Sequence, residues 1–124
     1  MIALPAMVAR WKAAWEALDP QAVAALYAPD GTHMSGVVRE RLGKEDATLH
    51  GPEEVLEYAT ASAKALKSFR ADIFNVIADG DDETGRAAVE YWRILNGDET
   101  NRMRVMETME WGGGRITSCR VFHF

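Results

Sequence analysis

Residues 103–111, MRVMETMEW, alternate apolar and polar side chains along one short stretch of the chain. The apolar members recur with a period of two: Met103, Val105, Met109 and Trp111. That period predicts a β-strand with one buried face. Glu107 interrupts the apolar row, and a carboxyl on a buried face must be paired or protonated, because an unpaired charge there costs several kcal/mol. The stretch therefore predicts a strand and marks a residue of interest for function.

Three further extended segments accompany this strand, at residues 68–78, 85–96 and 115–124. The connections between the segments, DGDDET, GDE and GGG, have the length and composition of hairpin turns. The second half of the chain is therefore predicted to form an antiparallel meander.

The first half of the chain carries helical patterns. Apolar residues repeat at three- and four-residue spacing over residues 4–18, and an Asp-Pro pair then begins a second predicted helix at residues 20–27. A third helix is predicted at residues 51–66, with acidic residues in its first turn and lysines late. Residues 32–38 are predicted to form a short strand, and residues 39–51 a polar loop.

Helices followed by an antiparallel meander indicate an α+β domain, in which three N-terminal helices cover one face of an antiparallel sheet. We expect residues 1–124 to form one domain, because this length suits a single core. The opposite sheet face has no helix left to cover it, and its strands are partly apolar. A homodimer through that uncovered face is therefore predicted.

Composition restricts the partners and the location. Hydrophobic residues make up 48% and charged residues 27% of the chain, which is typical of soluble globular proteins. The net charge of −5 argues against nucleic acid and anionic membranes as partners, because both require clustered lysine and arginine. No apolar run approaches the roughly 20 residues of a membrane span, and the first residues lack the pattern of a secretory signal. The single cysteine, Cys119, excludes an internal disulfide. We expect a cytoplasmic protein.

No metal or cofactor site is predicted. The histidines His33, His50 and His123 show no i, i+4 pairing, and no carboxylate lies at a metal-ligand spacing from them. The glycines at residues 112–114 join two strands and precede no helix, so they do not match a phosphate-binding loop.

Several local strings are similar to the nuclear transport factor 2-like superfamily, which includes ketosteroid isomerases and SnoaL-type polyketide cyclases. The strings are AAWEALDPQAVAALYAPDGTH at residues 13–33, HGPEEVLEY at residues 50–58, NVIADGD at residues 75–81, and METMEWGGGRITSCRVF at residues 106–122. The resemblance implies a cone-shaped, cystatin-like fold in which helices and a curved sheet enclose an apolar pocket for a small molecule. Because this fold carries many functions, the resemblance implies no single activity.

The family's known catalytic residues are mostly replaced in this chain. The general-base aspartate of the ketosteroid isomerases falls on Ser35, their tyrosine donor on Trp11, and their protonated acid on Glu107. A serine cannot shuttle protons as a base near neutral pH, so steroid isomerisation by that mechanism is not expected. The C-terminal aspartate of SnoaL-type cyclases falls on Phe124.

The remaining polar residues give the candidate site. His33 is the natural base, because an unperturbed histidine has a pKa of ~6.5. Glu107 is the candidate acid or hydrogen-bond donor, because burial raises the pKa of a carboxyl. The predicted substrate-binding residues are Trp11, Trp15, Tyr27, Ser35, Tyr58, Phe74, Glu90, Met109, Trp111, Cys119 and His123.

Structural alternatives stand beside each assignment. Glu107 could pair with an arginine or with His123 and only fix the strand register, and His33 could lie half exposed at a strand edge. A two-residue turn at residues 97–98 points Glu90 into the pocket, whereas a three-residue turn points Tyr91 there. The aromatic residues are more often core than ligand-binding.

Two functions are consistent with these residues. The first is a cofactor-independent acid/base enzyme, of the isomerase, cyclase or dehydratase type, acting on an apolar carbonyl-bearing substrate. The second is a ligand-binding or dimerisation module of the same fold without catalysis.

Overall fold

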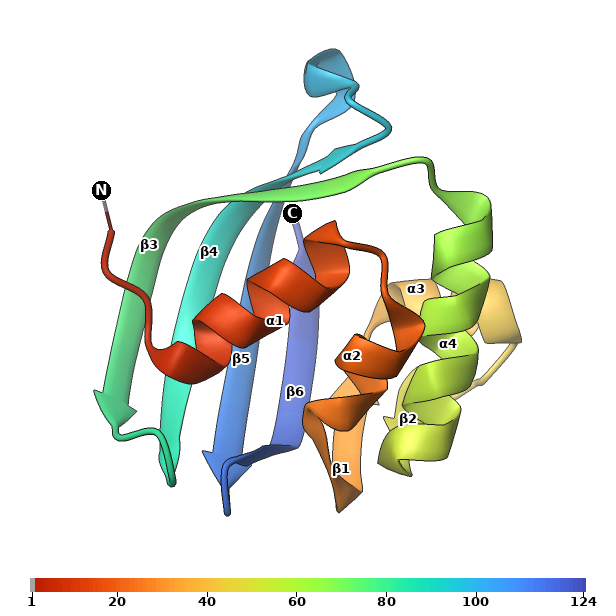
Figure 1. Cartoon of the computed structure of the whole chain (residues 1–124). Helices are drawn as coiled ribbons and strands as arrows, with labels where there is room; N and C mark the ends of the chain where they lie inside the picture. The colour runs from red at the N-terminus through yellow and green to blue at the C-terminus, as the bar shows by residue number, and fades with distance from the viewer. Residues whose placement is uncertain (1) are drawn as a thin grey trace.

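A computed structural model, which describes residues 2–124, contains a curved, unclosed six-stranded sheet with helices against its concave face (Figure 1). The α-helices are α1 (Ala6–Glu16), α2 (Pro20–Ala25), α3 (Gly36–Leu42) and α4 (Gly51–Ala65), and a 3-10 turn, η1, spans Glu99–Asn101. The strands are β1 (Tyr27–Met34), β2 (Thr48–His50), β3 (Phe69–Gly80), β4 (Gly85–Leu95), β5 (Met103–Gly112) and β6 (Arg115–His123). The predicted α+β class and the predicted meander, β3 to β6, are confirmed.

The strand order in the sheet is β2-β1-β6-β5-β4-β3. Neighbours pair antiparallel except β1 and β6, which run parallel, with His33 opposite Cys119. The prediction of a wholly antiparallel sheet is therefore wrong at this pair. No hairpin joins β1 to β6, so turn chemistry does not set their relative direction.

Helix α1 lies across the concave face of the meander, while α2 and α4 pack together beside β1 (Figure 1). The buried face of α1 consists of Met7, Val8, Trp11, Ala14 and Trp15. The predicted helix continues to Leu18, whereas α1 ends at Glu16, so Leu18 is not part of this face. Opposite it, the inner positions of β5 are buried, and they include Glu107. The core therefore fills the space between α1 and the meander.

Residues 32–51 differ from the prediction. The strand ends at Met34, because the Ser35 side chain accepts a hydrogen bond from the backbone N–H of Val37 (3.2 Å) and caps α3. Gly43, with a φ of 68°, ends that helix in the left-handed conformation that glycine adopts freely. The predicted loop at residues 39–51 therefore holds the end of α3 and the strand β2, and the helices number four rather than three in residues 2–124.

The register of β4 points Tyr91 inward and Glu90 outward. Neither predicted turn length connects β4 to β5, because β4 ends at Leu95 and β5 begins at Met103, so residues 96–102 form a longer link with η1. On the outer face, Glu90 accepts a hydrogen bond from Asn75 (2.9 Å) and forms an ion pair with Arg104 (2.9 Å).

The convex sheet face is not covered by a helix (Figure 1). Its exposed apolar side chains include Phe74, Ile77 and Phe122. A bulge between Ile73 and Asn75 places Phe74 on this side, where it packs against Trp92 with a ring-centroid distance of 6.0 Å. None of the helices within residues 2–124 is long and apolar enough to cross a membrane.

Candidate functional site

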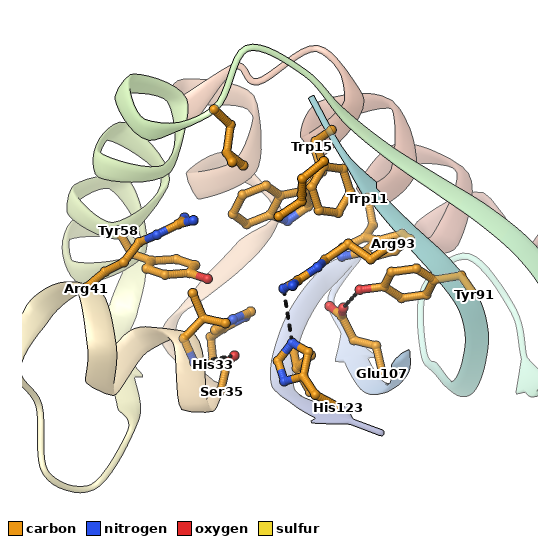
Figure 2. Close-up of a pocket in the computed structure, with 15 residues that line it drawn as sticks. Trp11, Trp15, His33, Ser35, Arg41, Tyr58, Tyr91, Arg93, Glu107 and His123 are labelled. Carbon is orange, nitrogen blue, oxygen red and sulfur yellow. Dashed lines mark hydrogen bonds between the residues drawn. The ribbon is translucent and has the colours of Figure 1, made fainter. Parts of the chain in front are cut away.

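A cavity opens between α1, α3, α4 and the concave sheet face (Figure 2). Its volume is about 50 Å³, and the wider hollow that includes the open mouth measures about 490 Å³. Aromatic side chains form much of the wall: Trp11, Trp15, Tyr58, Phe69 and Tyr91. Aliphatic side chains complete the apolar lining: Val37, Leu66, Leu95 and Val121. The polar lining consists of His33, Ser35, Arg41, Arg93, Glu107 and His123.

Glu107 reaches the cavity from the middle of β5 and is only 3% exposed. The Tyr91 hydroxyl donates a hydrogen bond to its Oε1 (2.9 Å), and the Cys119 thiol donates one to its Oε2 (3.0 Å). Glu107 forms no ion pair with any cation in residues 2–124. The sequence alternative of a partner arginine or His123 is therefore wrong, because both hydrogen-bond partners of Glu107 are neutral.

Burial raises the pKa of Glu107, and the hydrogen bonds from Cys119 and Tyr91 oppose that rise. The Trp11 indole also acts against the rise in pKa, although its N–H does not reach hydrogen-bond geometry with any acceptor in the described residues. Burial has the larger effect, so the protonated carboxyl is favoured relative to an exposed glutamate. A protonated carboxyl can donate a hydrogen bond as well as accept one.

His33 lies near the end of β1 and is only 4% exposed, so the half-exposed alternative is wrong. Its Nδ1 and the Tyr27 hydroxyl are joined by a hydrogen bond of 2.8 Å. Burial lowers the pKa of His33 to about 4. The imidazole is therefore neutral at pH 7, and one of its ring nitrogens is already engaged by Tyr27.

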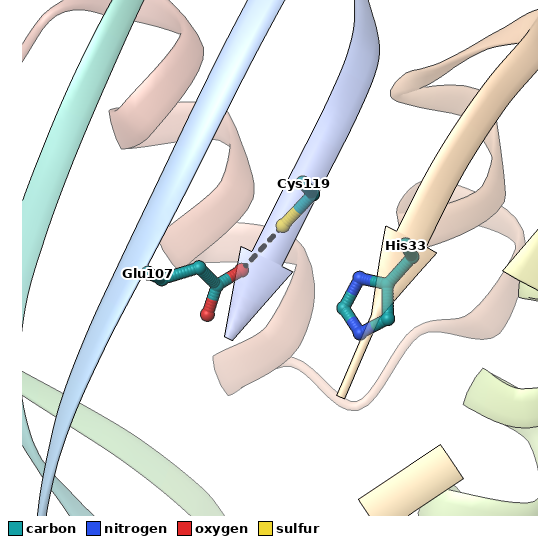
Figure 3. A group of neighbouring side chains, drawn as sticks. All are labelled: His33, Glu107 and Cys119. Carbon is teal, nitrogen blue, oxygen red and sulfur yellow. Dashed lines mark hydrogen bonds between the residues drawn. The ribbon is translucent and has the colours of Figure 1, made fainter. Parts of the chain in front are cut away.

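His33, Glu107 and Cys119 form a buried cluster in which one ligand-type atom of each lies within 4.8 Å of the others (Figure 3). Imidazole, carboxylate and thiolate are the ligands that bind Zn²⁺ in proteins. However, burial raises the pKa of the Cys119 thiol well above its usual value, as it raises that of Glu107. In this arrangement the Cys119 thiol donates to Glu107, and binding of Zn²⁺ at the cluster would release the thiol proton.

Arg41 and Arg93 were not among the predicted site residues, yet both line the cavity. Arg41 extends from α3, and its Nη1 donates to Ser62 Oγ (2.5 Å). Arg93 extends from β4, with Nη1 3.4 Å from Nε2 of His123. Sequence reasoning missed Arg41 because it placed residue 41 in a loop, and Arg93 because the register of β4 was open.

The structure separates the other predicted substrate-binding residues into three groups. One group lines the cavity: Trp11, Trp15, Ser35, Tyr58 and His123. A second group is buried in the core outside the cavity wall: Tyr27, Met109, Trp111 and Cys119. Phe74 and Glu90 lie on the convex face, so their assignment to the pocket is wrong; the bulge in β3 and the register of β4 are the causes.

Known structures share this fold, and two of them contain different small molecules. A SnoaL-like protein of unknown function from Burkholderia thailandensis is 20% identical, with a TM-score of 0.75 and 94% of this chain and 89% of that chain covered. A protein with a ketosteroid isomerase-like fold from Catenulispora acidiphila, in complex with trimethylamine, is 21% identical, with a TM-score of 0.70 and coverage of 97% and 86%. The Orange Carotenoid Protein of Anabaena, which binds canthaxanthin, is 12% identical, with a TM-score of 0.75 and coverage of 96% and 36%.

These structures share the fold, and their low identities carry no activity over to this chain. No curated protein is significantly similar in sequence. The model of the SnoaL-like domain matches residues 8–119, which is most of the chain, and it confirms the resemblance drawn from the sequence. The chain therefore belongs to the SnoaL-like domain family.

Proposed function

We propose that this protein is a cofactor-independent acid/base enzyme, of the isomerase, cyclase or dehydratase type, acting on a small apolar carbonyl compound. The observation that carries the proposal is the pairing of His33 and Glu107 in one cavity wall. Burial lowers the pKa of the imidazole and raises that of the carboxyl, so His33 is free to accept a proton at pH 7 and Glu107 keeps its proton to higher pH than an exposed glutamate does.

The reaction begins with the substrate carbonyl near Glu107 and its α-carbon near His33. The free ring nitrogen of His33 takes the α-proton, the C–H electron pair forms a C=C bond, and the carbonyl electrons move onto oxygen. The protonated Glu107 donates a hydrogen bond to that oxygen. This role requires the His33 tautomer in which Nδ1–H donates to Tyr27, because only then does Nε2 carry a lone pair.

Three features of the cavity support this chemistry. Its wall is largely aromatic and aliphatic, and apolar surroundings strengthen hydrogen bonds to a developing oxyanion. Tyr91 and Cys119 hold the Glu107 carboxyl in one orientation, so the donor is preorganised. The cavity volume of about 50 Å³ favours a substrate of modest size.

The alternative is a pocket that binds a small molecule without transforming it. A protein of the same fold is in complex with trimethylamine and another binds canthaxanthin, which supports small-molecule binding by a protein of this fold. The pKa of about 4 also makes His33 a weak base. This alternative predicts binding that depends on the cavity residues, with no bond made or broken.

Deuterium exchange distinguishes the two functions. Small ketones and α,β-unsaturated ketones are incubated with the protein in D₂O, and NMR follows loss of the α-proton signals. We expect exchange that falls by about 10²-fold or more in H33Q, which removes the base. The matched control is H50Q, the same change at an exposed histidine. Exchange that is equal in H33Q and H50Q contradicts the catalytic role of His33, and ketone binding without exchange establishes the alternative.

We also propose that the chain forms a homodimer through the convex sheet face and works in the cytoplasm. The exposed side chains of Phe74, Ile77 and Phe122 on that face support the dimer, since apolar side chains gathered on an uncovered sheet favour a protein partner. The single cysteine, Cys119, is free and buried, which fits a reducing compartment.

A further inference from the structure

The proposed chemistry uses the imidazole and the carboxyl, and it leaves the two cavity arginines without a role. We propose that Arg41 and Arg93 bind a carboxylate on the ligand, so that the ligand is a small apolar carboxylic acid. The expectation that this acid also has a carbonyl group rests on the proposed function, whereas the expectation of a carboxylate is based on the two arginines alone. The inference therefore names the substrate class of the same site.

The two guanidinium groups approach the cavity from opposite walls and point toward one another (Figure 2). Within residues 2–124, neither arginine forms an ion pair with a carboxylate. Glu40 is close enough for its charge to raise the pKa of Arg93, but it makes no ion pair with it. Glu107 shares the cavity, but its bonds go to Tyr91 and Cys119.

Arg93 has an incomplete set of hydrogen bonds. Its Nε is buried and has no partner in the described residues, and Nη1 meets only His123 Nε2, at 3.4 Å. Burial lowers the pKa of Arg93, and repulsion from Arg41 adds to that effect. A buried guanidinium N–H without an acceptor is costly, and a planar carboxylate is the group that its fork of donors fits best.

Arg41 is held in place before any ligand arrives. Its Nη1 donates to Ser62 Oγ at 2.5 Å, and the same hydroxyl donates to the backbone carbonyl of Tyr58 at 2.9 Å. This bond uses one of its five N–H donors and leaves the charge without a counterion in the described residues. The protein thus fixes two positive groups around one cavity, although the chain as a whole has a net charge of −5.

The rest of the wall determines what the carboxylate is attached to. Trp11, Trp15 and Phe69 provide apolar surface, which fits a hydrocarbon chain or a small ring. His33 and Glu107 contribute to the same wall, so a carbonyl can meet them while the carboxylate meets the arginines. The arrangement fits a compact oxo acid better than a neutral ketone.

Calorimetry on the full chain tests the inference with 3-methylbutanoate and benzoate, each compared with its neutral amide at pH 7.5 in low salt. We expect the carboxylates to bind at least tenfold more tightly than the amides. R93M and R41M should each weaken carboxylate binding at least tenfold, while R86M, the same change at an exposed position of β4, should stay within twofold of wild type.

Three results overturn the inference. The first two are amides that bind as tightly as the acids and an R93M variant that folds and retains the wild-type affinity. The acid-amide comparison on the wild type remains decisive if R93M does not fold. Tighter binding of benzyl phosphate than of benzoate also overturns it, because the arginines would then select a phosphate. Failure of the proposed catalysis looks different: carboxylates bind through Arg93, but no α-proton exchanges in any oxo acid.

Discussion

The Tyr91 hydroxyl on β4 donates to Oε1 of Glu107 on β5 across a distance of 2.9 Å, inside the cavity wall. Both residues are inner-face positions of neighbouring strands, so the sheet itself sets this contact. It is a hydrogen bond between neutral partners when Glu107 is protonated. The contact therefore orients the carboxyl without supplying a charge.

Replacing Tyr91 by phenylalanine tests that orienting role. Y91F keeps the ring that packs against Trp11 at a centroid distance of 5.2 Å but removes the hydroxyl. We expect the free energy of unfolding to fall by about 1 kcal/mol and ketone α-proton exchange to slow by roughly tenfold, less than for loss of a direct oxyanion donor. Urea denaturation and exchange by NMR measure both. Wild-type exchange in Y91F would show that the carboxyl needs no orientation by this bond.

Acid should destabilise the protein through His33. The histidine titrates near pH 4 in the folded state and near 6.5 when unfolded, so between these values the unfolded chain binds more protons. Stability is therefore lost as the pH falls from 6.5 toward 4, by up to about 3 kcal/mol from this residue. Urea denaturation across this range measures the free energy of unfolding at each pH. For H33Q this free energy should fall less steeply with decreasing pH than for wild type. The control H50Q leaves the buried imidazole in place and should keep the wild-type slope.

Raising the pH should destabilise the protein through Glu107, whereas lowering the pH destabilises it through His33. Its folded-state pKa lies above the ordinary 4.5, so the folded protein holds its proton to higher pH than the unfolded chain does. The stability contributed by this proton is present at low pH and is lost as the pH rises through the folded-state pKa. E107Q should therefore gain stability relative to wild type as the pH increases above 4.5, measured by denaturation at several pH values. E110Q, at an exposed position of β5, should show no such gain; an equal gain there would assign the effect to general surface charge.

Metal removal should leave the proposed activity intact. Because the Cys119 thiol donates a hydrogen bond to Glu107 at 3.0 Å, these two groups satisfy each other without a metal. We therefore expect dialysis against a chelator to change neither ketone exchange nor the melting temperature. C119S, which keeps a hydroxyl donor for the carboxyl, should retain exchange within several-fold. A chelator-sensitive activity that Zn²⁺ restores, with about one metal per chain by mass spectrometry, would instead make His33, Glu107 and Cys119 a metal site.

A charge on the convex face should break the proposed dimer. Ile77 is 69% exposed on β3, so I77D should leave the fold intact and place a carboxylate within the apolar interface. Light scattering after size exclusion should report a dimer for wild type and a monomer for I77D. K64D, at an exposed position of α4, should remain dimeric. A monomeric wild type at high micromolar concentration would end the proposal.

The sequence predicted those parts of the site that depend on local periodicity. The alternation along β5 correctly placed Glu107 among buried residues, and the three- and four-residue spacing of α1 correctly placed Trp11 and Trp15 on its buried face. His33 was likewise expected to face the pocket, and it lines the cavity. The positions on α1 and β5 follow from the backbone period alone, so a single sequence carries enough information to find them, whereas the orientation of His33 was implied by the resemblance to the nuclear transport factor 2-like superfamily.

The missed residues depend on longer-range geometry. Arg41 lies on a helix whose signals were present, a serine at its start and a glycine at its end, but whose seven residues are too short to show a clear period. The orientation of Arg93 depends on a strand register that the irregular link at residues 96–102 sets. The meeting of His33 with Cys119 depends on a parallel pairing that no turn encodes.

The parallel pairing of β1 with β6 also determines when the site is completed during synthesis of the chain. β1 is synthesised before the strands of the meander and β6 after the other strands of the sheet, yet the two lie side by side around the cluster of His33, Glu107 and Cys119. Contacts between such distant segments form late, because a long loop must close first. A nascent chain that has formed its helices and most of its meander therefore still lacks a finished site, and ligand cannot assist folding until the sheet is complete.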